Sequence, residues 1–424
     1  MKQLFRKYRT SPFAQNVSVL ASGSIVAQVI SVLISPVLSR IYSPEDYGLL
    51  AVFLSVLNMF AVVLCFRYEL AIVLPKDESD AINLVKLCLM ISSGFALILL
   101  ILSFSFSTEI ASMLGNERMS FWLPFLVLTI FITAVYNTFN YFLTRNQRYK
   151  SITKAKVVQS IGQSALSVGI GVSGYSSIGL LISSIAGQFI AASVLISVGL
   201  KKIFHFRRND FKQMVSLIKH YKEFPAINLP LAIIDIFSLQ VIVILISNFF
   251  SDEITGYYSF ALRLLTIPSV LIGGAIGQVF YQRLSDLVNQ RGEYKSFILQ
   301  TWRTLLAGSI VPLIIIIIFA PDLFAFVFGE NWRYSGNIAS VLSVMYFFMF
   351  LTAPVSSIYL IFNQQKLALI FTFNSFIYRP LTVYLGYLYN DFMLGIILLV
   401  ICESVNLVLL YSLLWRKVLN YKHP

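Results

Sequence analysis

Six charged side chains lie inside long apolar stretches of this 424-residue sequence. A charge at the centre of a membrane-spanning helix costs about 2.5–3.5 kcal/mol on insertion scales, so it usually marks a pathway or a buried partner. The guanidinium of arginine binds phosphate through two parallel hydrogen bonds, whereas a lone carboxylate can bind a proton or a cation. The pattern therefore predicts an anion-binding cavity with acids in a coupling or gating role. The candidate cavity cations are Arg67, Arg263 and Arg379, and the candidate acids are Asp235, Glu403 and Glu69.

Arg379 and Glu403 fall near the middle of two consecutive apolar stretches, 367–389 and 392–415. With a rise of about 1.5 Å per residue, both side chains are expected near the bilayer midplane, close enough to pair. Two interpretations are open. The residues form a structural ion pair, or Arg379 faces a cavity and Glu403 orients it.

The other two arginines can be interpreted as surface residues as well. Arg263 lies near the outer end of its stretch, so its side chain either reaches the outer surface or points into a cavity. Arg67 and Glu69 lie where the stretch 47–72 ends, at the inner surface or in the cavity. At the inner surface, Glu69 would be within reach of Lys86.

Neighbouring polar residues extend this set. Asp235 has Asn228 two turns earlier on the same helical face. This carboxylate either couples transport to a proton or sodium ion, or binds one of the arginines. A polar stripe at helical spacing in the first stretch suits a cavity wall or a tight seam between helices. The stripe consists of Ser24, Gln28, Ser31 and Ser35.

Apolar stretches long enough to cross a bilayer recur from end to end of the chain. Hydrophobic residues make up 58% of the sequence and charged residues 12%, against about 25% charged in an ordinary soluble domain. A helix crossing the hydrocarbon core needs about 20 mostly apolar residues. The sequence therefore predicts an all-α integral membrane protein with 12 transmembrane helices. The expected ranges are 17–38, 47–72, 84–106, 121–143, 157–174, 178–199, 225–249, 257–280, 302–320, 337–361, 367–389 and 392–415.

The placement of basic residues predicts the orientation. With a cytoplasmic N-terminus, 26 of the 32 Lys and Arg residues fall on the cytoplasmic side, and only Arg40, Arg118 and Arg333 fall outside. This bias follows the positive-inside rule, so both termini are expected in the cytoplasm. The net charge of +13 is distributed over short loops between apolar helices and does not indicate nucleic-acid binding.

The chain divides into two similar halves joined by a basic segment. We expect an N-terminal six-helix lobe at 1–200, a cytoplasmic linker at 201–224 and a C-terminal six-helix lobe at 225–424. Two like-oriented repeats would be pseudo-symmetric about an axis along the membrane normal. The repeated motifs are Ser39–Gly48 with Ser247–Gly256, Leu114-Gly115 with Phe328-Gly329, and Asn146-Gln147 with Asn363-Gln364, at offsets of 208, 214 and 217.

No catalytic or metal site is predicted. The expected loops are too short for a catalytic domain, and the sequence has no Gly-rich phosphate loop, nucleophile motif or metal-ligand cluster. Cys65, Cys88 and Cys402 lie in apolar segments without ligand spacing. Two bundles with a substrate between them near the midplane are typical of transporters. No cofactor is expected beyond a coupling ion, H⁺ or Na⁺.

Five motifs, in this order along the chain, resemble those of one transporter superfamily. With the expected six-plus-six helices, the chain resembles the polysaccharide exporters of the multidrug/oligosaccharidyl-lipid/polysaccharide superfamily, and within it the O-antigen (Wzx-type) flippases. The motifs are Ser39–Gly48, Arg67–Pro75, Phe224-Pro225, Gly256-Tyr257-Tyr258 with Arg263 and Pro268, and Phe328–Trp332.

The resemblance implies a V-shaped exporter bundle in the bacterial cytoplasmic (inner) membrane. It implies alternating-access transfer of undecaprenyl-diphosphate-linked oligosaccharide to the periplasmic leaflet, for O-antigen (lipopolysaccharide) or capsular polysaccharide synthesis. The cavity arginines would hold the diphosphate. The implied partners are this lipid-linked oligosaccharide, membrane lipid and the polysaccharide polymerase machinery. A drug or cation antiporter of the same fold, or another 12-helix secondary carrier, is the alternative.

Overall fold

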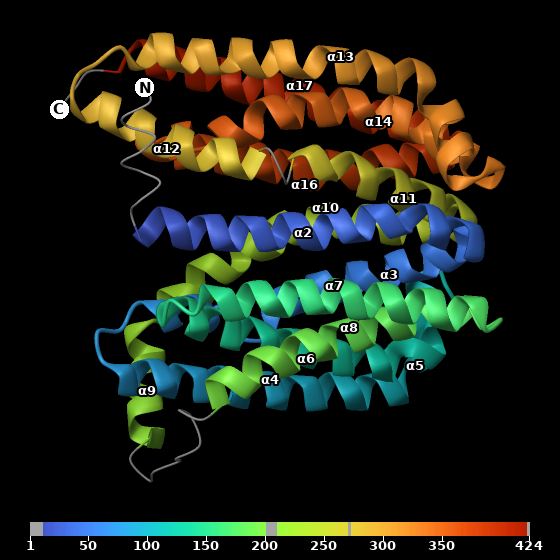
Figure 1. The fold of residues 1–424 in the computed structure, drawn as a ribbon, viewed down its shortest axis with the longest axis horizontal. Helices are drawn as coiled ribbons and strands as arrows, with labels where there is room; N and C mark the ends of the chain where they lie inside the picture. Colours follow the sequence, from blue (N-terminus) through green and yellow to red (C-terminus); the bar gives the residue numbers. More distant parts are fainter. Residues whose placement is uncertain (1–11, 201–209, 270–272, 422–424) are drawn as a thin grey trace. The chain divides into compact units, whose positions relative to one another are not determined.

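The computed structural model describes residues 12–200, 210–269 and 273–421, and every regular element in them is a helix. The chain divides into two compact units, Met1–Gln240 and Val241–Pro424 (Figure 1). The first residues of the chain and positions 201–209 of the expected linker lie outside the described residues. The predicted boundaries of lobes and linker stay a prediction.

The first unit is built from long helices connected by short turns. Its elements are α2 (Pro12–Ile41), α3 (Pro44–Val63), η1 (Tyr68–Val73), α4 (Glu78–Ser105), α5 (Ser107–Met113), α6 (Met119–Arg145), α7 (Tyr149–Val172), α8 (Ser176–Gly199), α9 (Asp210–His220), η3 (Phe224–Asn228) and the start of α10 (Leu229–Phe249).

The second unit contains the end of α10 and the following helices. These are α11 (Asp252–Pro268), α12 (Gly274–Asn289), α13 (Tyr294–Phe328), η5 (Glu330–Trp332), α14 (Arg333–Thr352), η6 (Ala353–Val355), α15 (Ile358–Ile361), α16 (Gln365–Leu388) and α17 (Phe392–Leu419).

Helix α3 is largely buried within the first unit. Its start is fixed by a capping box, in which Ser43 and Asp46 each accept a hydrogen bond from the other's backbone N–H. Apolar residues surround the helix on all sides, and Val52 and Phe53 are fully buried. An all-round apolar helix of this kind packs inside a bundle.

The expected helix 47–72 ends earlier than the sequence suggests. Helix α3 ends at Val63, and the backbones of Phe66 (φ 47°) and Arg67 (φ 64°) are left-handed. The chain then continues as the short 3₁₀ helix η1. A left-handed backbone at two consecutive non-glycine residues is unfavourable, and no local sequence pattern predicts it.

Two other expected elements can be compared with the structure. The expected helix 257–280 overlaps α11 and α12, and residues 270–272 lie outside the described residues. The expected linker 201–224 contains a helix, α9. The sequence predicts a loop here because the segment is too short and too charged to cross a membrane.

Among the described residues, nine helices are long and apolar enough to cross a membrane. The chain is therefore a multi-pass membrane protein, and the count of twelve stays a prediction. Helices α7, α11 and α16, which carry the fifth, eighth and eleventh expected spans, are not among the nine. Glycines dilute α7, and Arg379 lowers the hydropathy of α16.

The predicted internal repeat is visible in the backbone. Helices α7 and α16 start 216 residues apart, at Tyr149 and Gln365, and also end 216 residues apart, at Val172 and Leu388. Helices α3 and α11 both begin after a serine whose side chain accepts a backbone hydrogen bond three residues on, Ser43 and Ser251. The two halves are thus pseudo-symmetric in their helix order.

One motif pairing shifts by a residue. The sequence motif aligned Asn146 with Asn363, whereas the left-handed residues are Gln147 (φ 54°) and Asn363 (φ 52°). The two left-handed residues are therefore 216 residues apart, the same offset as between the helices that follow them, α7 and α16. Backbone conformation, rather than residue type, is what the two turns share.

Candidate functional site

The most deeply buried ion pair among the described residues of the second unit is Arg379 of α16 with Glu403 of α17. The guanidinium binds the carboxylate through two hydrogen bonds, Nε to Oε2 at 3.0 Å and Nη2 to Oε1 at 2.8 Å. Both residues are buried, at 8% and 4% exposure. Such a bidentate pair compensates two charges that would otherwise be very costly away from water. The structure thus brings these two predicted residues together.

A hydrogen-bonded network continues from this pair along α16. Tyr378 donates its hydroxyl proton to Glu403 Oε2 at 2.6 Å, and Ser375 lies 3.1 Å from the Tyr378 hydroxyl. The amide of Asn406 donates to Ser375 at 3.2 Å, and Asn374 donates to Asn406 at 2.9 Å. Polar groups in a low-dielectric interior reinforce one another when each has a partner.

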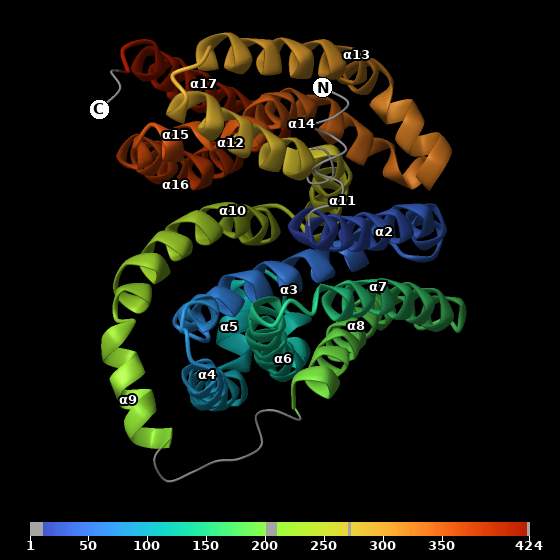
Figure 2. The same ribbon diagram turned by 60° about the vertical axis from the view of Figure 1, so that its left-hand side comes forward.

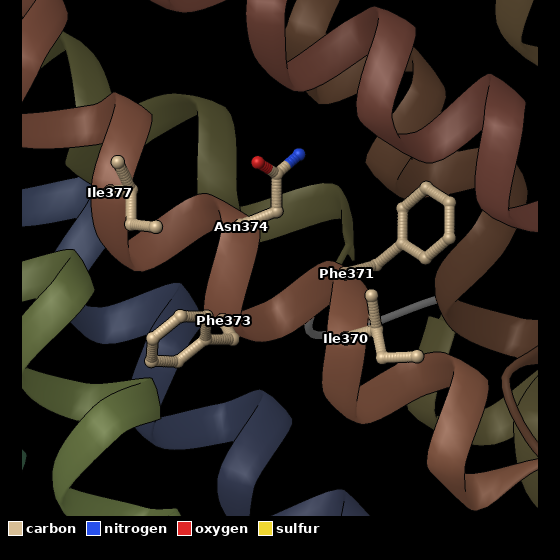
Figure 3. Close-up of a pocket in the computed structure, with 5 residues that line it drawn as sticks. All are labelled: Ile370, Phe371, Phe373, Asn374 and Ile377. Atoms are coloured by element: carbon tan, nitrogen blue, oxygen red, sulfur yellow. The ribbon is translucent and has the colours of Figure 1, made fainter.

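The end of this network at Asn374 lies at an open pocket of about 260 Å³ on α16. Asn374 is its polar residue, and Ile370, Phe371, Phe373 and Ile377 supply its apolar lining (Figure 3). The amide of Asn374 is exposed and the ion pair is buried. A continuous set of hydrogen bonds therefore connects the surface of α16 to the Arg379–Glu403 pair.

In the first unit, Arg67 and Glu69 form a looser pair. Arg67 Nη1 lies 3.6 Å from Glu69 Oε1, too far for a hydrogen bond. Arg67 Nε and Glu69 Oε2 are buried and have no hydrogen-bond partner among the described residues. Arg67, with its left-handed backbone, directly precedes η1, and Glu69 lies in its first turn.

The protonation of Glu69 should respond to pH near neutrality. Its element, η1, lies outside the candidate membrane spans. Burial raises the pKa of this carboxyl to about 7, although Arg67 acts in the opposite direction. A raised pKa means that the folded protein holds this proton when the unfolded chain has lost it. The contribution of Glu69 to the free energy of unfolding is therefore fully present below about pH 4.5 and is lost as the pH rises toward about 7.

Glu69→Gln should remove this pH dependence. We expect the unfolding temperature of the variant, relative to the unmodified protein, to increase between mildly acidic and neutral pH. Thermal unfolding in detergent across that range measures the effect. Glu109→Gln, at an exposed acid of α5, is the matched control and should give a flat difference. A flat difference for Glu69→Gln would contradict the raised pKa.

Of the six charges singled out in the sequence, Arg263 and Asp235 have no counterion among the described residues. The side chain of Arg263, half-buried on α11, makes no ion pair or hydrogen bond with another residue that the structure describes. The same holds for Asp235 on α10, which is exposed. Asn228, two turns before it, lies in η3 and is half-buried. Arg263 thus differs from Arg67 and Arg379, whose charges face acids.

The polar stripe of α2 lies against α7. Ser160 donates to the carbonyl oxygen of Ala27 at 2.8 Å, and its hydroxyl lies 3.4 Å from that of Ser31. Ser35 is buried and Gln28 half-buried. Of the two interpretations of this stripe, the contacts favour a tight seam between helices.

Lys156 is a cation inside a helix that the sequence interpretation missed. Its ammonium group donates to the hydroxyl of Ser24 at 3.0 Å. The expected fifth helix, 157–174, leaves Lys156 in a loop, whereas α7 begins at Tyr149. The absence of a capping residue at this start left no local signal. The polar periodicity of α16, by contrast, could have revealed Asn374, Ser375 and Tyr378.

A metal site is not formed in the described part of the chain. No group of three or more His, Cys, Asp or Glu residues there could hold an ion. The three cysteines are free thiols, with Cys65 and Cys88 buried. The chemistry that the six predicted charges offer is electrostatic. Arg379 and Glu403 form a hydrogen-bonded pair and Arg67 and Glu69 a looser one, whereas Arg263 and Asp235 have no counterion among the described residues.

Comparison with known proteins gives one family match. The sequence model of a family described as "Polysaccharide biosynthesis protein" matches residues 37–337. An uncharacterized membrane protein in the cps region of Klebsiella pneumoniae is 20% identical over 409 residues, which cover 94% of this chain and 81% of that protein.

Two further relatives are named as biosynthesis proteins. The succinoglycan biosynthesis transport protein ExoT of Rhizobium meliloti (strain 1021) is 22% identical over 73% of this chain. The teichuronic acid biosynthesis protein TuaB of Bacillus subtilis (strain 168) is 22% identical over 72%. This chain spans 61% and 62% of the lengths of these two proteins.

Solved structures of the same fold belong to transporters. An inward-facing multidrug resistance MATE family transporter of the MOP superfamily matches with a TM-score of 0.70 and 13% identity, over 93% of this chain and 95% of that one. The lipid II flippase MurJ, in an inward closed conformation, matches with a TM-score of 0.73 and 14% identity, over 93% and 87%. The predicted fold class, an all-α exporter-type membrane bundle, is confirmed.

Proposed function

Because the chain belongs to the family of polysaccharide biosynthesis proteins, we propose that it flips undecaprenyl-diphosphate-linked oligosaccharides across the bacterial cytoplasmic membrane. It is a membrane transporter, not an enzyme, and its resemblance to Wzx-type flippases of the MOP superfamily is borne out by family and fold. The cargo moves from the cytoplasmic to the periplasmic leaflet by alternating access. The repeat units then serve O-antigen or capsular polysaccharide synthesis.

The names of the relatives support this cargo. ExoT is named for succinoglycan transport and TuaB for teichuronic acid biosynthesis, and MurJ is a flippase for lipid II. The shared theme of these names is a carbohydrate polymer or its lipid-linked precursor. A multi-pass bundle with cytoplasmic termini, close to the polysaccharide polymerase machinery, would deliver such units to the periplasmic side.

The state of Arg263 is the observation that supports an anionic cargo. Glu403 compensates the charge of Arg379 through two hydrogen bonds, and Arg67 lies beside Glu69. Arg263 keeps an uncompensated guanidinium, half-buried, which can bind a diphosphate in bidentate fashion. Asp235 is correspondingly free to bind a proton or sodium ion that drives the cycle.

The accumulation of cargo in cells tests the proposal. In a strain lacking this protein, intact lipid-linked repeat units should accumulate, inaccessible to a membrane-impermeant glycosidase added to the periplasmic side. Restoring the protein should make them accessible. Normal arrival of unpolymerised units in the periplasm of the deletion strain would contradict the proposal and favour a drug or metabolite carrier.

Substituting Arg263 by glutamine should weaken transport without weakening the fold. We expect a loss of flipping of about tenfold or more, since a charge-assisted hydrogen bond contributes about 1.5–3 kcal/mol. Arg333→Gln is the matched control, because Arg333 is an exposed arginine that already binds Glu330 and Asp322. Equal flipping by both variants, at equal membrane expression, would remove Arg263 from the cargo site.

A further inference from the structure

Helix α9, Asp210–His220, presents three different faces. Met214 and Leu217 are buried, whereas Phe211, Val215 and Ile218 are exposed at 56%, 39% and 37%. Lys212 and Lys219 are exposed and lie seven residues apart on the next face. With 3.6 residues per turn, the exposed apolar stripe lies between the buried face and the two lysines.

The buried face fixes α9 to the first unit. Asn83, near the start of α4, donates its amide to Gln213 Oε1 at 2.5 Å. Tyr68 of η1 donates its hydroxyl to the carbonyl oxygen of Ile218 at 3.4 Å. The side of α9 that carries Met214 and Leu217 is therefore occupied by protein. The stripe of Phe211, Val215 and Ile218 lies on a different side of α9, which is exposed.

The direction of α9 is also distinctive. Figures 1 and 2 show it running crosswise to α4 and α6 of the same unit, at the end of α4 where the chain enters that helix. Helix α4 is one of the candidate membrane spans and begins at Glu78. A helix across the start of a span lies along the boundary between membrane and water, not through the bilayer.

We propose that α9 is an interfacial helix that lies in the headgroup layer of the membrane and binds acidic phospholipids. The exposed stripe of Phe211, Val215 and Ile218 enters the upper acyl region, and Lys212 and Lys219 contact phosphate groups beside it. Ser216 and His220, on the remaining face, are exposed to water. Apolar area on one side and lysines at its edge are the combination that holds amphipathic helices at acidic membrane surfaces.

Spin labels on the full-length protein in lipid nanodiscs test the position of α9. Labels at Val215→Cys and Ser216→Cys, in a Cys402→Ser background, compare two adjacent positions about 100° apart around the helix, one on the apolar stripe and one on the face assigned to water. We expect the ratio of collisions with oxygen to collisions with a water-soluble nickel complex to be several-fold higher at 215. Similar ratios at both positions, or a label at 215 shielded from both reagents, would overturn the membrane contact.

The lysines are tested by lipid composition. Adding phosphatidylglycerol to phosphatidylcholine nanodiscs should increase the oxygen-to-nickel ratio at 215, and Lys212→Gln/Lys219→Gln should abolish this response. Lys150→Gln/Lys154→Gln is the matched control, because both of these lysines are exposed on α7. An unchanged response in the Lys212/Lys219 variant would show that acidic lipid does not bind these lysines and would overturn that part of the proposal.

Discussion

Replacing Arg379 by methionine should lower the free energy of unfolding by about 3–5 kcal/mol, since it leaves the carboxylate of Glu403 buried without its counterion. The pair is bidentate and both residues are nearly inaccessible. Tyr378 would still donate to Glu403 and compensate part of the loss. Thermal unfolding of purified protein in one detergent measures the effect.

Two further variants make this result specific. Arg333→Gln breaks an exposed ion pair, which water and salt screen, so it should change the stability little. The double variant Arg379→Met/Glu403→Leu removes both charges and should recover much of the stability lost by the single change. A single variant no less stable than the Arg333→Gln control would show that the pair does not stabilise the second unit.

The second large effect is expected at Gly336, in the first turn of α14. A Cβ atom there would lie 2.5 Å from Cα of Pro321 and 2.6 Å from the carbonyl oxygen of Ala320. Both contacts are with backbone of α13, which cannot move aside as a flexible side chain can. Gly336→Ala should therefore force the helices apart and lower the free energy of unfolding by about 1–3 kcal/mol.

Gly308→Ala is the matched control for this prediction. Gly308 lies in the interior of α13, and a Cβ atom there would meet no atom within 4 Å. Alanine in place of an unconstrained helical glycine should stabilise by about 0.5–1 kcal/mol. Opposite signs for the two variants in thermal unfolding would support the close packing of α13 and α14. Destabilisation by both would contradict it.

Local and periodic features of the fold could be read from the sequence. The serine caps at Ser43 and Ser251, the repeat between the halves and the depth match of Arg379 with Glu403 are all present in residue type and spacing. Apolar length predicts membrane helices because the bilayer sets a minimum span. These features depend on few residues, so few contacts need to be known.

Features that depend on tertiary contacts could not be predicted. The left-handed backbone at Phe66 and Arg67, which ends α3 early, has no sequence signature. The network from Asn374 to Glu403 requires the register between α16 and α17. The contacts of the α2 stripe with Ser160 and Lys156, which favour a seam over a cavity wall, also depend on tertiary structure.

The charge arrangement suggests how one chain can hold both a stable bundle and an anion site. The Arg379–Glu403 pair satisfies itself and fixes α16 to α17, so its arginine is committed to the fold. Arg263 has no such commitment among the described residues and is available to a ligand. If Arg263 binds the cargo as proposed, Arg379 variants should be unstable and Arg263 variants should be stable but inactive.

Reconstituted flipping tests the central claim most directly. Purified protein would be placed in liposomes that contain undecaprenyl-diphosphate-linked oligosaccharide in both leaflets, and a membrane-impermeant glycosidase would be added outside. Our account predicts that nearly all of the oligosaccharide becomes cleavable, whereas protein-free liposomes and the Arg263→Gln protein protect the inner-leaflet share. Protection of that share in liposomes with the unmodified, folded protein would contradict the assignment of this chain as a lipid-linked oligosaccharide flippase.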